Sequence, residues 1–94
     1  RSLDQAIESA NRAGEQYAQL GRLTDAAHAF WLAGQLHREA GDSDGAVWAL
    51  ESAVEGFTAA SQRKLRIKVA SELIELLRAT GQDAKVEALL ASLN

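Results

Sequence analysis

The sequence predicts an all-α fold in which short antiparallel helical hairpins stack side by side. The first observation is composition: 47% of the 94 residues are hydrophobic, chiefly alanine and leucine, and proline is absent. Alanine and leucine lose little side-chain freedom in a helix, so this composition favours helices over sheets. The second observation is a helix stop that returns every 20 residues, and the third is an apolar stripe that returns in phase with it. The length fits one domain.

The predicted helices end at four regularly spaced positions, Gly21, Gly41, Ser61 and Gly81. Glycine adopts the left-handed conformation that closes a helix at its C-terminus without steric cost. Side-chain oxygens shortly after three of these stops, at Thr24, Ser43 and Asp83, are expected to cap the next helix. The pattern predicts five helices, near residues 2–20, 24–40, 44–60, 64–80 and 83–93.

Inside the helices, apolar residues fall at i, i+4, i+7, i+8 and i+11, which is one face of an α-helix. We therefore expect one buried stripe per helix. Its columns are Ala6, Ala26, Ala46; Ala10, Phe30, Leu50, Ala70, Leu90; Ala13, Ala33, Ala53, Leu73, Leu93; Gly14, Gly34, Val54, Ile74; and Tyr17, His37, Phe57, Leu77. A mid-helix glycine costs about 1 kcal/mol relative to alanine. We expect close packing of a neighbouring helix at Gly14 and Gly34, against a large residue such as Tyr17, Phe30 or Phe57.

Connections this short turn successive helices antiparallel, so each helix should touch mainly its neighbours in the chain. The segment AGEQYAQLGRLTDAAHAFWLA, residues 13–33, resembles the tetratricopeptide repeat signature. The matching positions are Ala13-Gly14, Tyr17, Leu20-Gly21, Ala26, Phe30 and Ala33. The segment AGDSDGAVWALESAVEGFTAAS is similar to the longer-period variant of that family, in which hairpins recur about every forty residues, as in the soluble attachment proteins of vesicle fusion.

This resemblance covers nearly the whole chain and implies a short right-handed α-solenoid whose concave face binds peptides or proteins. The sequence departs from the family pattern at Ala10, where the family has a large aromatic residue, at Arg66, where it has a small one, and in lacking proline between repeats. We expect residues 1–94 to form a single tetratricopeptide-like helical-repeat domain. The chain opens at Arg1 without methionine, so we expect it to be a fragment of a longer protein.

Three side chains of the third predicted helix are candidates for partner binding: Trp48, Glu51 and Glu55. Trp48 lies off the buried stripe and shares a helix face with the two glutamates. An aromatic ring beside carboxylates suits a partner segment of basic character, through stacking and charge pairing. The alternative, which we favour on base rates, is that Trp48 packs against the next hairpin, because large aromatic residues are mostly buried.

Two further groups are candidates for the same role. Trp31 points away from the core residue Phe30 and lines either a groove or the contact with the fourth helix, of which we favour the second. Glu8, Asn11 and Glu15 form a polar stripe on the first helix, in the register where the tetratricopeptide family places its concave contacts. An ordinary solvated helix face is the more common explanation. If this stripe and the glutamates of the third helix face one groove, that groove is acidic.

A basic cluster stands at the start of the fourth predicted helix and consists of Arg63, Lys64, Arg66 and Lys68. Positive charge at a helix N-terminus opposes the helix dipole. The cluster is a candidate site for an anion or an acidic partner. The alternative, which we favour, is a solvated corner whose charges pair with Glu72 or with a neighbouring loop.

Several classes of function find no support in the sequence. There is no glycine-rich phosphate loop, nucleophile elbow or metal-ligand constellation, so we expect no enzyme, no cofactor and no metal site. A net charge of −3 argues against nucleic acid as a partner. The longest apolar run, AAHAFWLAG, is far shorter than the roughly 20 residues of a membrane span. The absence of cysteine favours a reducing compartment, and we expect the cytoplasm.

The function that the sequence favours is a protein–protein interaction scaffold, which binds a partner peptide or protein segment, expected to be basic, in a helical groove. The alternative is self-assembly, or a structural role within a larger multidomain protein, because the ends of a helical stack expose apolar surface unless they are capped. The last predicted helix carries Val86, Leu89, Leu90 and Leu93 with few charges opposite, and could be an internal cap or the contact of a homo-oligomer.

Overall fold

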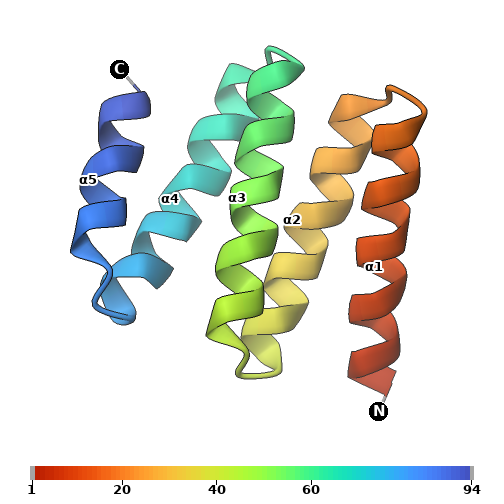
Figure 1. Cartoon of the computed structure of the whole chain (residues 1–94), viewed down its shortest axis with the longest axis horizontal. Coiled ribbons are helices and arrows are strands. Elements are labelled where there is room, and N and C mark those ends of the chain that lie inside the picture. The colour runs from red at the N-terminus through yellow and green to blue at the C-terminus, as the bar shows by residue number, and fades with distance from the viewer. Residues whose placement is uncertain (1, 94) are drawn as a thin grey trace.

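The computed structural model describes residues 2–93, and within them the chain forms five α-helices and no strand. The helices are α1 (Ser2–Gln19), α2 (Leu23–Glu39), α3 (Ser43–Ala59), α4 (Arg63–Ala79) and α5 (Asp83–Ser92). They stand side by side in chain order, the chain reverses direction at each turn, and α1 and α5 lie at opposite edges (Figure 1). Each helix packs chiefly against its neighbours in the chain. The predicted all-α class is confirmed, with the helix bounds shifted by about one residue.

All four turns are closed in the same way. Gly21, Gly41 and Gly81 have φ angles of +75°, +77° and +73°, and Ser61 has +58°, so the four predicted stops are confirmed as left-handed residues. At the first turn the amide of Gly21 donates to the carbonyl of Ala18 at 3.0 Å, and the amide of the next residue donates to that of Tyr17 at 2.9 Å. The same pair of hydrogen bonds recurs at the other three turns. This is a Schellman motif, which satisfies the last carbonyls of each helix.

The predicted N-terminal caps Thr24, Ser43 and Asp83 are wrong, because all three lie inside their helices. The residues that begin α2 to α5 are Arg22, Asp42, Gln62 and Gln82. Each directly follows the left-handed residue, so one residue both completes the Schellman motif and starts the next helix, which leaves no room for a separate cap. Among these four, Asp42 alone caps through its side chain, which accepts a hydrogen bond from the amide of Gly45 at 3.0 Å.

Replacement of Ser61 by glycine is expected to stabilise the protein by about 0.5–1 kcal/mol. Ser61 is the one residue of the described chain other than glycine with a positive φ, and a side chain in that conformation is strained. The gain should appear as a higher urea midpoint with an unchanged m-value. The matched control is Gly41→Ser at the equivalent position, which should destabilise by a similar amount. Equal stability of Ser61→Gly and the wild type would contradict this account.

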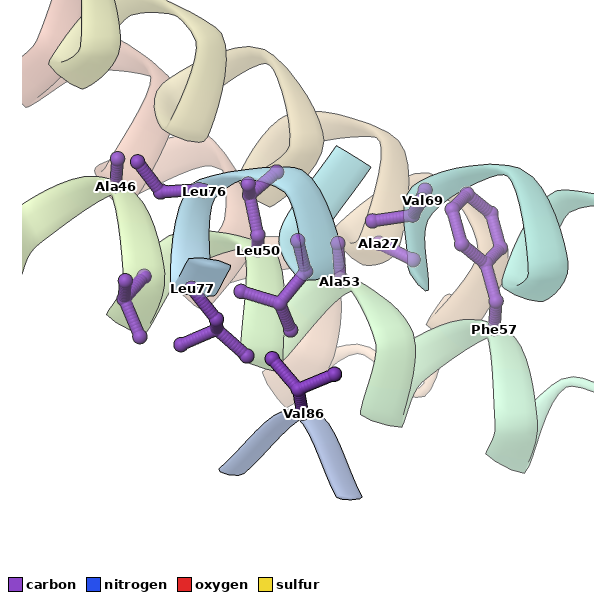
Figure 2. Packing of buried hydrophobic residues seen from close by; sticks show 11 residues of the cluster. Ala27, Ala46, Leu50, Ala53, Phe57, Val69, Leu76, Leu77 and Val86 are labelled. Atoms are coloured by element: carbon purple, nitrogen blue, oxygen red, sulfur yellow. The ribbon is translucent and has the colours of Figure 1, made fainter. Parts of the chain in front are cut away.

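The main core runs through α2 to α5. Figure 2 shows its side chains converging between α3, α4 and α5, with Val86 reaching in from α5. The buried members are Ala27, Ala46, Val47, Leu50, Ala53, Phe57, Val69, Leu73, Leu76, Leu77 and Val86. A smaller cluster of Ala10, Ala33 and Ala49 joins α1 to α2 and α3. The first helix is therefore held mostly by small residues, whereas the middle of the chain holds the large ones.

The predicted stripe is buried or half-buried throughout, with one correction: Leu90 is 40% exposed. The residue lies on α5, the last described helix, so no following helix covers its second flank. The stripe was also too narrow for α3. Ala49 lies off the stripe and is buried as well, because α3 has neighbours on both sides.

The two mid-helix glycines lie at close approaches between helices, as predicted. A Cβ atom on Gly14 would stand 2.7 Å from the end of the Phe30 ring, which is one of the predicted partners. A Cβ atom on Gly34 would stand 2.6 Å from a methyl carbon of Leu50, so here the expectation of an aromatic partner was wrong. These contacts set how closely α2 approaches α1 on one side and α3 on the other.

Candidate functional site

Two hollows flank α3. The first, called the C-terminal hollow, has a volume of about 370 Å³ and lies between α3, α4 and α5. Its apolar wall consists of Val54, Leu73, Leu77, Ala88 and Leu89. Its polar lining consists of Glu51, Glu55 and Lys85. The hollow is open to the surface and offers apolar area with carboxylates at one side.

The second, called the N-terminal hollow, has a volume of about 350 Å³ and lies between α1, α2 and α3. Small residues leave the space, because Ala18, Ala26, Gly56 and Ala59 line it. Its remaining lining consists of Leu23, Phe30, Ser52 and Glu55. Gly56 is needed for this geometry, since a Cβ atom there would lie 2.9 Å from the Cβ atom of Ala27.

Glu55 is the single residue that lines both hollows, so the two meet at its side chain. Within residues 2–93 no hydrogen bond or ion pair is recorded for this carboxylate. Glu51, one turn earlier on α3, differs: its carboxylate lies 3.7 Å from the ammonium of Lys85 on α5. The α3 helix thus presents one carboxylate that is paired within the chain and one that is exposed between two apolar hollows.

Trp48 contacts the preceding helix, α2, through its ring, whereas the sequence favoured packing against the next hairpin. Its ring meets that of Phe30 edge-on, with centroids 5.6 Å apart and planes at 89°, so the indole packs against α2. It is nevertheless 47% exposed. Phe30 lines the N-terminal hollow, so Trp48 stands beside that hollow and presents an apolar surface next to it.

Trp31 takes part in packing between α2 and α4. Its indole nitrogen donates a hydrogen bond to Glu72 at 3.0 Å, and its ring meets Phe57 edge-on at 6.0 Å. The ammonium of Lys68 lies 5.9 Å from the centre of the same ring. Trp31, like Trp48, lines neither hollow, so it is not among the residues that surround Glu51 and Glu55.

The polar stripe of the first helix lies apart from the glutamates of α3. Glu8, Asn11 and Glu15 line an open depression with a volume of about 520 Å³, which is lined by α1 residues alone. Glu8 is paired with Arg12 at 3.5 Å, both side chains being exposed. The structure therefore does not bring the two acidic groups into one groove.

The basic cluster is split. Lys68 lies over Trp31, as described above, whereas Arg63 and Arg66 line a small hollow of about 200 Å³ beside Phe57 and Ser61. The expected pairing with Glu72 is wrong, because no ion pair joins that carboxylate to the basic cluster among residues 2–93; Glu72 instead accepts the hydrogen bond from Trp31. No ion pair is recorded for Arg63, Lys64 or Arg66 in the part of the chain that the structure describes.

The predicted contact residues near the end of the chain differ in how far they are buried. Val86 is buried in the main core and Leu89 lines the C-terminal hollow, which favours an internal cap over an oligomer contact for these two. Leu93 is half-buried. Leu90 is thus the exposed part of the predicted contact surface.

The two histidines differ in exposure. The His37 side chain is 13% exposed, with Nδ1 lying 3.1 Å from a carboxylate oxygen of Asp42, and His28 is exposed with its ring stacked beside Trp31. No group of three or more histidine, cysteine or acidic side chains gathers as a metal site among residues 2–93. Over the same residues, no helix has the length and apolar character needed to cross a membrane.

The sequence analysis named Glu51 and Glu55, which line the C-terminal hollow, and Trp48, which lines neither hollow, but it did not name Lys85 or the apolar walls as site residues. Comparison with protein-family models, with curated proteins and with solved structures gives no match to this chain. The function is therefore inferred from the geometry of the hollows.

Proposed function

We propose that this chain is a protein-interaction module that binds a partner segment across α3, in the two hollows that meet at Glu55. That meeting is the observation that carries the proposal. Hollows of this size fall within the range of ligand pockets, which are mostly apolar with a few polar groups that orient the ligand. An extended segment that crosses α3 can place a side chain on either side of the helix and one over it.

We propose further that the five helices form a short right-handed α-solenoid of the tetratricopeptide type, with the longer hairpin period. Three features favour this arrangement. All four turns are closed in the same way, each helix contacts mainly its neighbours in the chain, and the apolar stripe keeps a constant register. In such a stack the first, third and fifth helices lie on one side. The hollows lie where α1 and α5 flank α3, with α2 and α4 forming part of their lining.

The composition of the hollows favours protein as the partner. Their walls are apolar and their charged lining is acidic apart from the paired Lys85, which suits a basic segment and disfavours nucleic acid. A cytoplasmic location stays a prediction, which rests on the absence of cysteine.

A matched pair of substitutions tests the proposal. Ser52 lines the N-terminal hollow, whereas Ser71 lies outside both hollows, and each hydroxyl donates to the carbonyl four residues earlier at 3.0 Å. Ser52→Arg places a cation in the hollow within reach of Glu55, and Ser71→Arg makes the same charge change elsewhere. Peptides selected on the wild-type protein from a random display library are expected to bind Ser71→Arg normally and Ser52→Arg about tenfold more weakly.

Thermal unfolding followed by circular dichroism checks that both variants fold. Equal binding of the selected peptides to both variants would place the binding surface elsewhere. If selection on the wild-type protein enriches no peptide above its frequency in the starting library, the proposal itself is contradicted.

A further inference from the structure

Glu55, the residue at which the two hollows meet, indicates the chemical character of the partner segment. We infer that the partner segment carries an arginine or lysine with an apolar side chain on each side of it, that Glu55 binds the cation, and that the two hollows take the flanking apolar groups. This inference rests on the proposed function and identifies the ligand of the same site.

The first support is the state of Glu55. Its carboxylate is exposed, lines both apolar hollows, and has no recorded partner in the described part of the chain. A carboxylate at the edge of apolar surface attracts a cation more strongly than one surrounded by water, because less solvent screens the pair. A partner carboxylate would meet repulsion from Glu55 and Glu51 together, so the site selects against acidic segments.

The second support is Lys85, whose ammonium group pairs with a carboxylate of α3 within the chain, as the partner's cation is inferred to pair with Glu55. It extends from α5 and lines the C-terminal hollow, and its ammonium reaches Glu51 of α3 at 3.7 Å. A long side chain can lie along apolar surface while its charged end reaches a carboxylate. Lys85 supplies a cation for Glu51, whereas no cation among residues 2–93 pairs with Glu55, which leaves that carboxylate available to a partner.

The third support is the apolar surface on both sides of Glu55. Leu73, Leu77 and Leu89 form one wall, and Phe30 with several alanines forms the other. A cation alone would leave these walls exposed to water. A segment with apolar side chains before and after its cation covers both walls and holds the cation over α3 at the same time.

The test uses two synthetic peptides that differ in charge alone. One has the sequence Gly-Ser-Leu-Ser-Arg-Ser-Leu-Ser-Gly, with blocked termini and a fluorescent label, and the other has citrulline in place of arginine. The arginine peptide is expected to bind the wild-type protein about fivefold more tightly than the citrulline peptide. With Glu55→Gln this preference should disappear, while Glu75→Gln, which removes an exposed carboxylate that lines neither hollow, should retain it.

These outcomes distinguish an error in the inference about Glu55 from an error in the proposed binding function. If both peptides bind equally, and Ser52→Arg weakens both, the hollows bind a segment but the role of Glu55 is wrong. If the arginine preference survives in Glu55→Gln, the cation binds elsewhere and the inference is overturned. If neither peptide binds at millimolar concentrations, while peptides selected from a library still depend on Ser52, the proposed spacing of apolar and cationic side chains is wrong and the binding face remains.

Discussion

Replacement of Phe57 by alanine is expected to lower the free energy of unfolding by about 3–5 kcal/mol. Phe57 is fully buried, and its ring meets His28 edge-on at 5.0 Å and Trp31 edge-on at 6.0 Å. It therefore joins α3 to α2 at the centre of the main core. Small domains unfold at a cost of only about 5–15 kcal/mol, so this loss should remove a large part of the total stability. Urea unfolding followed by circular dichroism measures it.

The matched control is Tyr17→Ala. Tyr17 occupies the same stripe position on α1, but its ring is half-buried and lies beside the guanidinium of Arg22, whose central carbon is 5.2 Å from the ring centre. Tyr17→Ala should lower the free energy of unfolding clearly less than Phe57→Ala does, because α1 has a helix on one side only. A loss for Phe57→Ala no greater than that for Tyr17→Ala would show that the core is not centred on α2 to α4.

Gly34→Ala is expected to destabilise the protein by about 1–3 kcal/mol, although alanine is the better helix former by about 1 kcal/mol. The added Cβ atom would stand 2.6 and 2.8 Å from two carbons of Leu50. Leu50 is fully buried, so its side chain cannot turn away without displacing packed neighbours. Steric overlap should therefore outweigh the gain in helix propensity. The unfolding midpoint in urea provides the measurement.

The sign of this effect should reverse when Leu50 is shortened. In a Leu50→Ala background the overlap is gone, so Gly34→Ala should stabilise through helix propensity and by filling part of the space. The double-mutant cycle then gives a coupling free energy of about 2–4 kcal/mol, because the loss of about 1–3 kcal/mol in the wild type becomes a gain of about 1 kcal/mol in the Leu50→Ala background. Additive effects of the two substitutions would contradict the close approach of α2 and α3 at Gly34.

The regular part of the fold could be predicted because it is encoded locally. A left-handed stop at Gly21, Gly41 and Gly81 depends on a single residue, and the buried stripe depends on the period of the α-helix. The helix caps could not be predicted as well. Asp42, the residue after Gly41, both completes the Schellman motif and starts α3, and this double role is visible only when the hydrogen bonds are known.

The candidate site was predictable only in part, for a related reason. Glu51 and Glu55 share a helix face, which follows from their spacing on α3. The contact of Lys85 with Glu51 joins residues far apart in the sequence, and it depends on how α5 crosses α3 and α4. The separation of Glu8 from Glu55 depends likewise on the packing of α1. Local periodicity does not encode angles between helices, so these relations required the structure.

The central claim is that a partner segment binds across α3 in the two hollows. The most direct measurement is a titration of the ¹⁵N-labelled protein with the tightest peptide from the display selection, followed by two-dimensional NMR. The account predicts that amide shifts change most at the lining of the hollows, around Ala18, Ser52, Glu55 and Ala88. Changes concentrated instead around Arg63 and Arg66, or around the exposed Leu90 of α5, would contradict it.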